Sequence, residues 1–144
     1  QESSQMDDFL KGEETIFEDF IFEMATIAPK DHKLGVDLKM HIYQPGEKKL
    51  SHGPRVKFFK HTKGDSFSIS VSKEPNRINL VAGKIDGLIT ESELNALVQK
   101  IRKYRIPLLN MWRDPGMSQE ELIDQMRDVD AGRPVEIGEK ANFA

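Results

Sequence analysis

Four histidines lie within thirty residues of one another, and histidine is the side chain best suited to acid–base or metal chemistry near neutral pH. They are His32, His41, His52 and His61. No two of them have the i, i+4 spacing that places two imidazoles on one face of a helix for a metal ion. His52 precedes Gly53-Pro54 in an expected loop beside Arg55, so it is the best acid–base candidate. We expect the histidines to be exposed or capping residues, and we assign no catalytic residue and no metal site.

Other catalytic signatures are absent from the sequence. There is no phosphate-binding glycine loop, no dinucleotide-binding turn, no H-E-x-x-H and no G-x-S-x-G. The chain has no cysteine, which excludes a thiol nucleophile, a thiolate metal site and a disulfide. The sequence therefore predicts a protein that is not an enzyme and that uses no cofactor.

Aromatic and basic residues of the types that anchor interfaces provide the candidate binding site. The candidates are Tyr43, Arg55, Lys57, Phe59, Arg102, Arg105 and Trp112. On an open sheet, such residues also stack bases and neutralise phosphates, although no RNA-recognition consensus is present. A protein partner and a nucleic-acid partner both stay open, as does a homo-oligomer.

Charge is distributed unevenly along the 144 residues, whose net charge is −3. Residues 2–23 contain eight acidic residues against Lys11 alone, whereas residues 30–63 contain nine basic residues. Either these zones complement one another within the fold, or a basic face meets an anionic partner.

Helices and strands must position these candidate residues. The first predicted element is an acidic amphipathic helix. Apolar residues at spacings of three, four and seven predict a helix over residues 6–27, within an N-terminal unit of residues 1–30. A strand over residues 20–27 is an alternative, because that stretch also tolerates alternation.

From Val36 to Gly83 the apolar period is two, which predicts a meander of four antiparallel strands. One sheet face should meet the core through Leu38, Met40, Ile42, Val56, Phe58, Phe67, Ile69, Val71, Ile78 and Leu80. The outer face should carry Lys39, His41, Tyr43, Arg55, Lys57, Phe59, Ser68, Ser70, Asn79 and Val81.

Helices should follow over residues 90–130. Thr90-x-x-Glu93 and Ser118-x-x-Glu121 are capping-box patterns, and Pro107 should end or kink the first helix near Arg105. Residues 131–144 should be irregular. The sequence thus predicts one α+β domain over residues 1–144. It has no signal-peptide pattern and no apolar run near the roughly 20 residues that span a bilayer, so we expect a cytoplasmic location and no membrane contact.

One ordering of motifs resembles a known family. The strand ending His41-Ile42-Tyr43, the loop His52-Gly53-Pro54, and the helix containing Leu108-Leu109-Asn110-Met111-Trp112 are similar to a small bacterial family of unknown function found beside toxin–antitoxin genes. The resemblance covers residues 38–113. It departs at the second loop histidine of the family, where this chain has Arg55 or Val56.

The function expected from the sequence is therefore non-enzymatic. We expect a bacterial or phage accessory protein, such as an antitoxin, an immunity protein or an inhibitor, that acts by protein–protein contact. The alternatives are a nucleic-acid-binding module that uses the basic, aromatic sheet face and, behind it, a His-dependent nuclease-like toxin.

Overall fold

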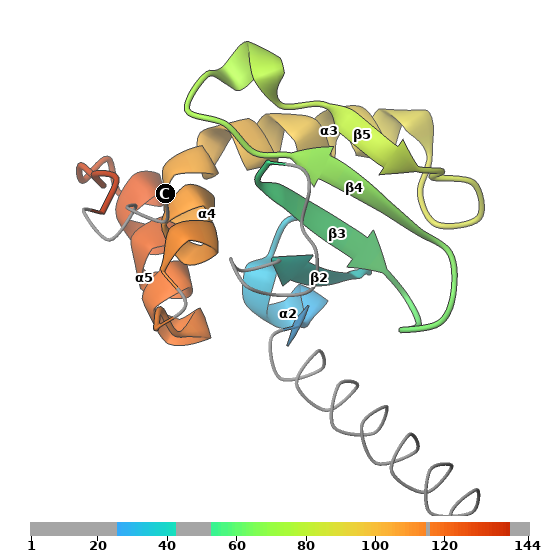
Figure 1. Cartoon of the computed structure of the whole chain (residues 1–144), viewed down its shortest axis with the longest axis horizontal. Helices are drawn as coiled ribbons and strands as arrows, with labels where there is room; N and C mark the ends of the chain where they lie inside the picture. Colours follow the sequence, from blue (N-terminus) through green and yellow to red (C-terminus); the bar gives the residue numbers. More distant parts are fainter. Residues whose placement is uncertain (1–25, 43–52, 115, 139–144) are drawn as a thin grey trace, which may run out of the picture.

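The structure is a computed structural model that describes residues 26–42, 53–114 and 116–138. Its elements are the strands β1 (Thr26–Ile27), β2 (Lys39–Ile42), β3 (Arg55–Phe59), β4 (Ser66–Ser70) and β5 (Leu80–Gly83), the helices α2 (Pro29–His32), α3 (Glu91–Lys103), α4 (Arg105–Arg113) and α5 (Gln119–Asp130), and the 3-10 helix η1 (Pro75–Arg77). The α+β class with an antiparallel sheet is confirmed (Figure 1).

The sheet has five strands in the order β1-β2-β3-β4-β5, so the prediction of four strands is wrong. The additional strand is β1, whose Thr26 and Ile27 pair with His41 and Met40. Ile27 is fully buried, and the Gln119 side chain donates a hydrogen bond to the Thr26 carbonyl at 3.1 Å. The predicted N-terminal helix lies mainly in residues 1–25, outside the described residues.

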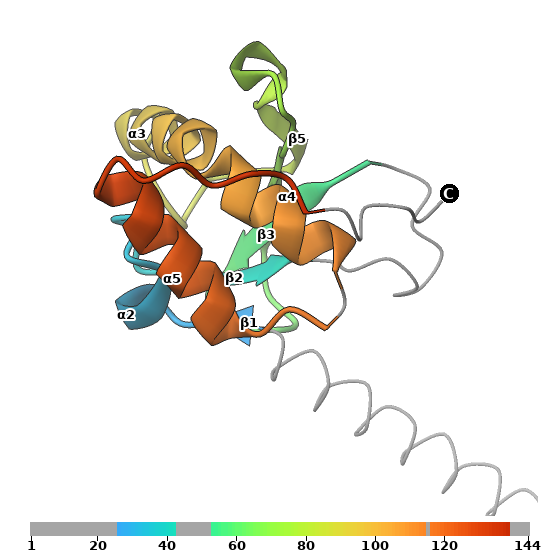
Figure 2. The ribbon, with the colours of Figure 1, turned by 90° about the vertical axis from the view of Figure 1, so that its left-hand side faces the viewer.

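The inner sheet face forms two apolar rows that run across the strands. Met40, Phe58 and Phe67 make one row, and Ile42, Val56 and Ile69 make the other. These residues are fully buried or nearly so, as are Leu97, Ile101 and Leu108 of the covering helices. Helices α3 and α4 therefore cover this face, and α5 lies beside α4 (Figure 2).

Local signals explain where the helices begin and end. Thr90 forms the predicted capping box with Glu93, through two hydrogen bonds of 3.0 and 3.1 Å. Pro107 has no N–H and its ring crowds the carbonyl four residues earlier, so the helix is interrupted at Tyr104. The Ser118 hydroxyl accepts from the Glu121 N–H and starts α5. The described part of the tail, residues 131–138, is irregular as predicted.

Four assignments to a sheet face need correction. His41, Phe59 and Ser68 were expected on an exposed outer face, but their exposed fractions are 0%, 1% and 7%. Leu80 was expected in the core and is 38% exposed. A register shift between Ser68 and Ile69 interrupts the β4–β5 ladder, so simple alternation fails in β5.

His32 is a buried structural residue and not the exposed or capping histidine expected from the sequence. Its Nδ1 accepts from the Leu34 N–H at 3.0 Å, and its Nε2 lies 2.7 Å from the Leu38 carbonyl. The proton is therefore on Nε2, which donates to that carbonyl. Burial lowers the pKa of His32, although the Leu38 hydrogen bond acts in the opposite direction. The ring fixes the irregular segment between α2 and β2.

This arrangement predicts a loss of stability in mild acid. A depressed pKa in the folded state means that the contribution of His32 is present above about pH 6.5 and is lost as the pH falls through the folded value. The melting temperature should fall over this range, and His32→Asn should be less stable at pH 8 but lose less on acidification. Thermal melts at pH 5–8 measure this. His61→Asn, at an exposed histidine, is the control and should keep the wild-type slope. An unchanged slope in His32→Asn would refute the assignment.

Candidate protein-binding surface

The edge strand β5 carries the exposed apolar side chains of the described chain. Leu80 is 38% exposed and Val81 49%, and these two are the large hydrophobic residues that are exposed among the described residues. No further strand of the described sheet lies beyond β5. An edge strand presents unpaired backbone groups to a partner, and exposed apolar residues on it add area to such a contact.

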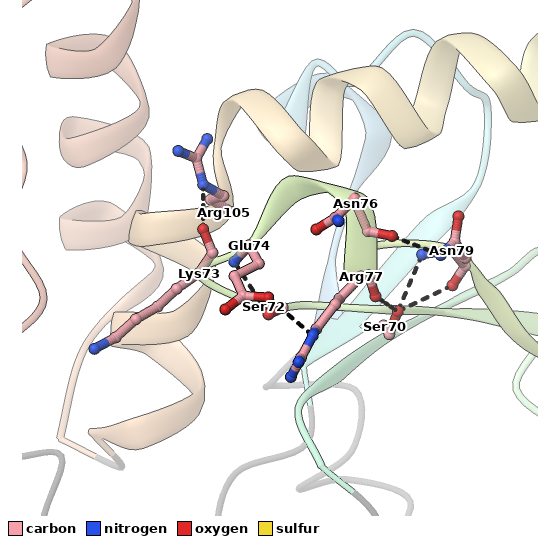
Figure 3. Close-up of polar contacts among 8 residues, drawn as sticks. All are labelled: Ser70, Ser72, Lys73, Glu74, Asn76, Arg77, Asn79 and Arg105. Atoms are coloured by element: carbon pink, nitrogen blue, oxygen red, sulfur yellow. Dashed lines mark hydrogen bonds and ion pairs between the residues drawn. The ribbon is translucent and has the colours of Figure 1, made fainter.

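The segment leading into β5 is held by a small polar network, drawn in Figure 3. The Ser70 hydroxyl lies 2.7 Å from the Arg77 carbonyl, to which it donates, and it accepts from the Asn79 N–H at 3.0 Å. The Asn79 side chain donates to the Asn76 carbonyl at 3.2 Å. These bonds close η1 onto the end of β4 and fix the position from which β5 starts.

Two arginines hold the same segment from the helix side. Arg102 Nη2 donates to the Ile78 carbonyl at 3.2 Å and approaches Asn79 Oδ1 at 3.4 Å. Arg105 Nε donates to the Lys73 carbonyl at 2.9 Å (Figure 3). Its Nη1 donates to the Arg102 carbonyl at 2.8 Å. Both were candidate binding residues in the sequence. The structure places Arg102 beside the residues that precede β5 and Arg105 beside Lys73, which follows β4. The donors of both bind this chain's own backbone.

The remaining candidates are scattered. Arg55 lies on β3 opposite Ser70 and is half-buried. Lys57 Nζ lies 5.8 Å from the centre of the Phe59 ring, and that ring is buried. Trp112 is half-buried against the core on α4. Tyr43, like His52, falls outside the described residues.

Lys103, Tyr104 and Asp130 form a second polar cluster, between the end of α3 and the end of α5. Lys103 Nζ and the Tyr104 hydroxyl donate to the same carboxylate oxygen of Asp130, at 2.8 and 2.6 Å. The bonds from Lys103 and then Tyr104 lower the pKa of Asp130, and the Asp130 bond raises the pKa of Lys103. Burial, and then the same carboxylate, raises the pKa of Tyr104. The ion pair between Lys103 and Asp130 is exposed to solvent, so it contributes little to the stability of the fold.

Two of the four histidines are buried in the described ranges. Both nitrogens of His32 bind backbone groups, and His41 is buried beneath the surface. No group of three or more His, Asp or Glu residues within 26–42, 53–114 and 116–138 is placed to hold a metal ion. Within the same ranges, every helix is too short or too polar to cross a membrane.

Sequence reasoning missed Ser70, Asn79 and η1 as the support of β5. The signal was present in part, because Pro75-Asn76 marks a turn and Ser and Asn bond readily to nearby backbone. The contacts from Arg102 and Arg105 join residues 24 and 32 positions apart, which no local pattern shows.

The network makes Ser70 more important than its neighbours on the same strand. Ser70→Ala removes the acceptor for Asn79 N–H and the donor to Arg77, and it should lower the free energy of unfolding by about 1 kcal/mol. Urea unfolding measures the loss, and amide hydrogen exchange at Asn79 should become faster. Ser66→Ala is the matched control, because Ser66 lies on the same face of β4 as Ser70, at the opposite end of the strand. Equal losses in both variants would contradict the role given to Ser70.

Comparison with known proteins gives no relative for this chain: no family model matches it, and neither the curated proteins nor the solved structures contain a significant match.

Proposed function

We propose that this chain is a non-enzymatic accessory protein of the antitoxin, immunity-protein or inhibitor type, and that it acts by protein–protein contact through β5. The observation that carries the proposal is the exposure of Leu80 and Val81 on an edge strand whose approach is fixed by Ser70, Arg102 and Arg105.

Strand addition is the mode of contact that fits this surface. An extended partner segment pairs its backbone with the outer edge of β5. Two successive side chains of that segment, which point to opposite faces of the sheet, then lie beside Leu80 and Val81. Because the segment before β5 is already held by several hydrogen bonds, little ordering of this chain is required on binding. Backbone bonds then supply affinity, and the two apolar side chains supply selectivity.

Charge indicates the kind of partner. Residues 53–84 contain seven basic and two acidic residues, so β3, β4, β5 and their connections are strongly basic. Complementary charge increases the rate of encounter and selects among partners. An acidic extended segment therefore fits the β5 edge better than a basic one.

The same basic excess favours the second candidate, a nucleic-acid-binding module that contacts phosphates. That alternative is weakened by the burial of Phe59 and His41, since stacking requires exposed rings. Arg102 and Arg105 also donate hydrogen bonds to backbone carbonyls of this chain, which leaves fewer of their donors for phosphates. A His-dependent nuclease would rest on His52, outside the described residues.

Val81→Lys tests the leading proposal. A charged side chain in place of Val81 should weaken capture of the specific partner from host lysate. It should also weaken binding of the isolated partner at least tenfold, which is the loss expected when an interface anchor is removed. Val135→Lys, at a half-buried residue of the irregular tail, is the control and should bind normally. Thermal melts must show that both variants are folded. Equal binding by Val81→Lys and the wild type would exclude the β5 edge.

Salt dependence separates the two candidates. The leading proposal expects no binding of labelled single-stranded RNA or DNA in fluorescence anisotropy at about 50 mM salt. Binding that weakens steeply by about 200 mM salt, and further in Lys60→Gln, would favour phosphate contacts instead.

A further inference from the structure

A second surface feature is a hollow between α2 and α5, and no residue of β5 lines it. Its volume is about 240 Å³, and Tyr104 of the α3–α4 junction forms part of its wall. Three cations line it, Lys30 and Lys33 from α2 and its C-terminal residue and Arg127 from α5, together with the apolar Ile123 and Met126. The hollow therefore combines positive charge with an apolar wall.

The lining of the hollow has a small excess of positive charge. Within the described residues, neither Lys30 nor Lys33 forms an ion pair, and Arg127 forms an exposed ion pair with Asp124 at 3.3 Å. Asp130 already accepts from Lys103 and Tyr104. Asp31 is the remaining carboxylate of the lining, which leaves two lysines, Lys30 and Lys33, against one acid.

The backbone of Lys33 gives an independent indication. Its φ of 53° and ψ of 35° place it in the left-handed region, and it is the non-glycine residue of the described chain with a positive φ. A residue at the end of a helix in this conformation is usually glycine, because a Cβ is strained there. A lysine at this position sacrifices stability, and strain of this kind concentrates at functional sites.

We propose that the hollow binds a phosphate group carried by a small molecule, with Lys33, Lys30 and Arg127 as the contacts to the phosphate oxygens. Ammonium and guanidinium groups are the usual partners of phosphate. A volume of about 240 Å³ is smaller than that of most pockets for drug-sized ligands, so the organic part is short and lies against Ile123 and Met126. This site does not rest on the β5 proposal.

The test is an NMR titration of the full chain with inorganic phosphate and then with glycerol 3-phosphate, at constant ionic strength set with potassium chloride. Amide shifts should concentrate in residues 30–33 and 123–130, and glycerol 3-phosphate should bind more tightly than phosphate. Shifts spread over all basic surfaces, or none with either probe, would overturn the proposal.

Lys33→Gly separates the site from a merely structural role. Removing the strained side chain should raise the melting temperature by a few degrees and weaken glycerol 3-phosphate binding at least fivefold. Lys33→Asn, which tolerates the same backbone conformation, should weaken binding similarly. Lys63→Gln removes a charge elsewhere and should bind as the wild type does. Unchanged affinity in Lys33→Gly would refute the site, whatever happens to its melting temperature.

Discussion

The rings of Phe58 and Phe67 stack across the two central strands, with centroids 5.5 Å apart and planes 23° from parallel. Phe58 also meets the edge of the His32 ring, at 6.3 Å and 88°. Both phenylalanines are almost completely buried, and burial of an aromatic side chain contributes several kcal/mol, on the order of 3–5 when it is truncated to alanine. The register of β3 against β4 and the seating of α2 on the sheet both depend on this contact. The helices then cover the same row through Leu97, Ile101 and Leu108.

Buried polar side chains hold the parts of the chain that have no regular structure. His32 fixes the segment before β2, as described above. Asn110 does the same at the other end of the molecule: its Nδ2 donates to Gln125 Oε1 and to the Glu136 carbonyl, both at 3.0 Å, and its Oδ1 accepts from the Gly138 N–H at 2.8 Å. Each group satisfies backbone atoms that no helix or strand reaches, which is the condition for burying irregular chain at low cost. These two side chains therefore attach irregular segments of the chain to the helices and strands beside them.

The sequence predicted those elements whose signals are local. Alternation located β2, β3 and β4, and Thr90, Pro107 and Ser118 located the ends of the helices. The first-choice prediction, a helix over residues 6–27, missed β1, which lies within the alternative strand over residues 20–27. Two residues are too few for a period, and the strand is also held by Gln119, 93 positions away. The burial of Phe59 and His41 also depends on tertiary packing, since alternation assigns a residue to a face of a sheet but does not say whether that face is covered. The exposure of Leu80 was missed because the register shift beside Ile69 is a property of two paired strands.

The candidate residues were chosen by type, and type alone does not distinguish an arginine that binds a partner from one that binds its own backbone.

That distinction shapes the functional surface. Arg102 and Arg105 each present several donors in a fixed plane, so each bonds to two acceptors at once and joins a helix to the η1 segment; a lysine at either position has a single point of charge and makes a poorer bridge. The exposed cations on the strands and turns are mostly lysines, such as Lys60, Lys63 and Lys84, which supply charge without fixed geometry. The arginines hold the chain between β4 and β5 through its backbone carbonyls, and the lysines add positive charge around the strands. In the proposed mode of binding, an edge strand positioned by internal hydrogen bonds and surrounded by exposed positive charge would pair with an extended acidic segment: backbone pairing would fix the geometry, and the charges would guide the approach.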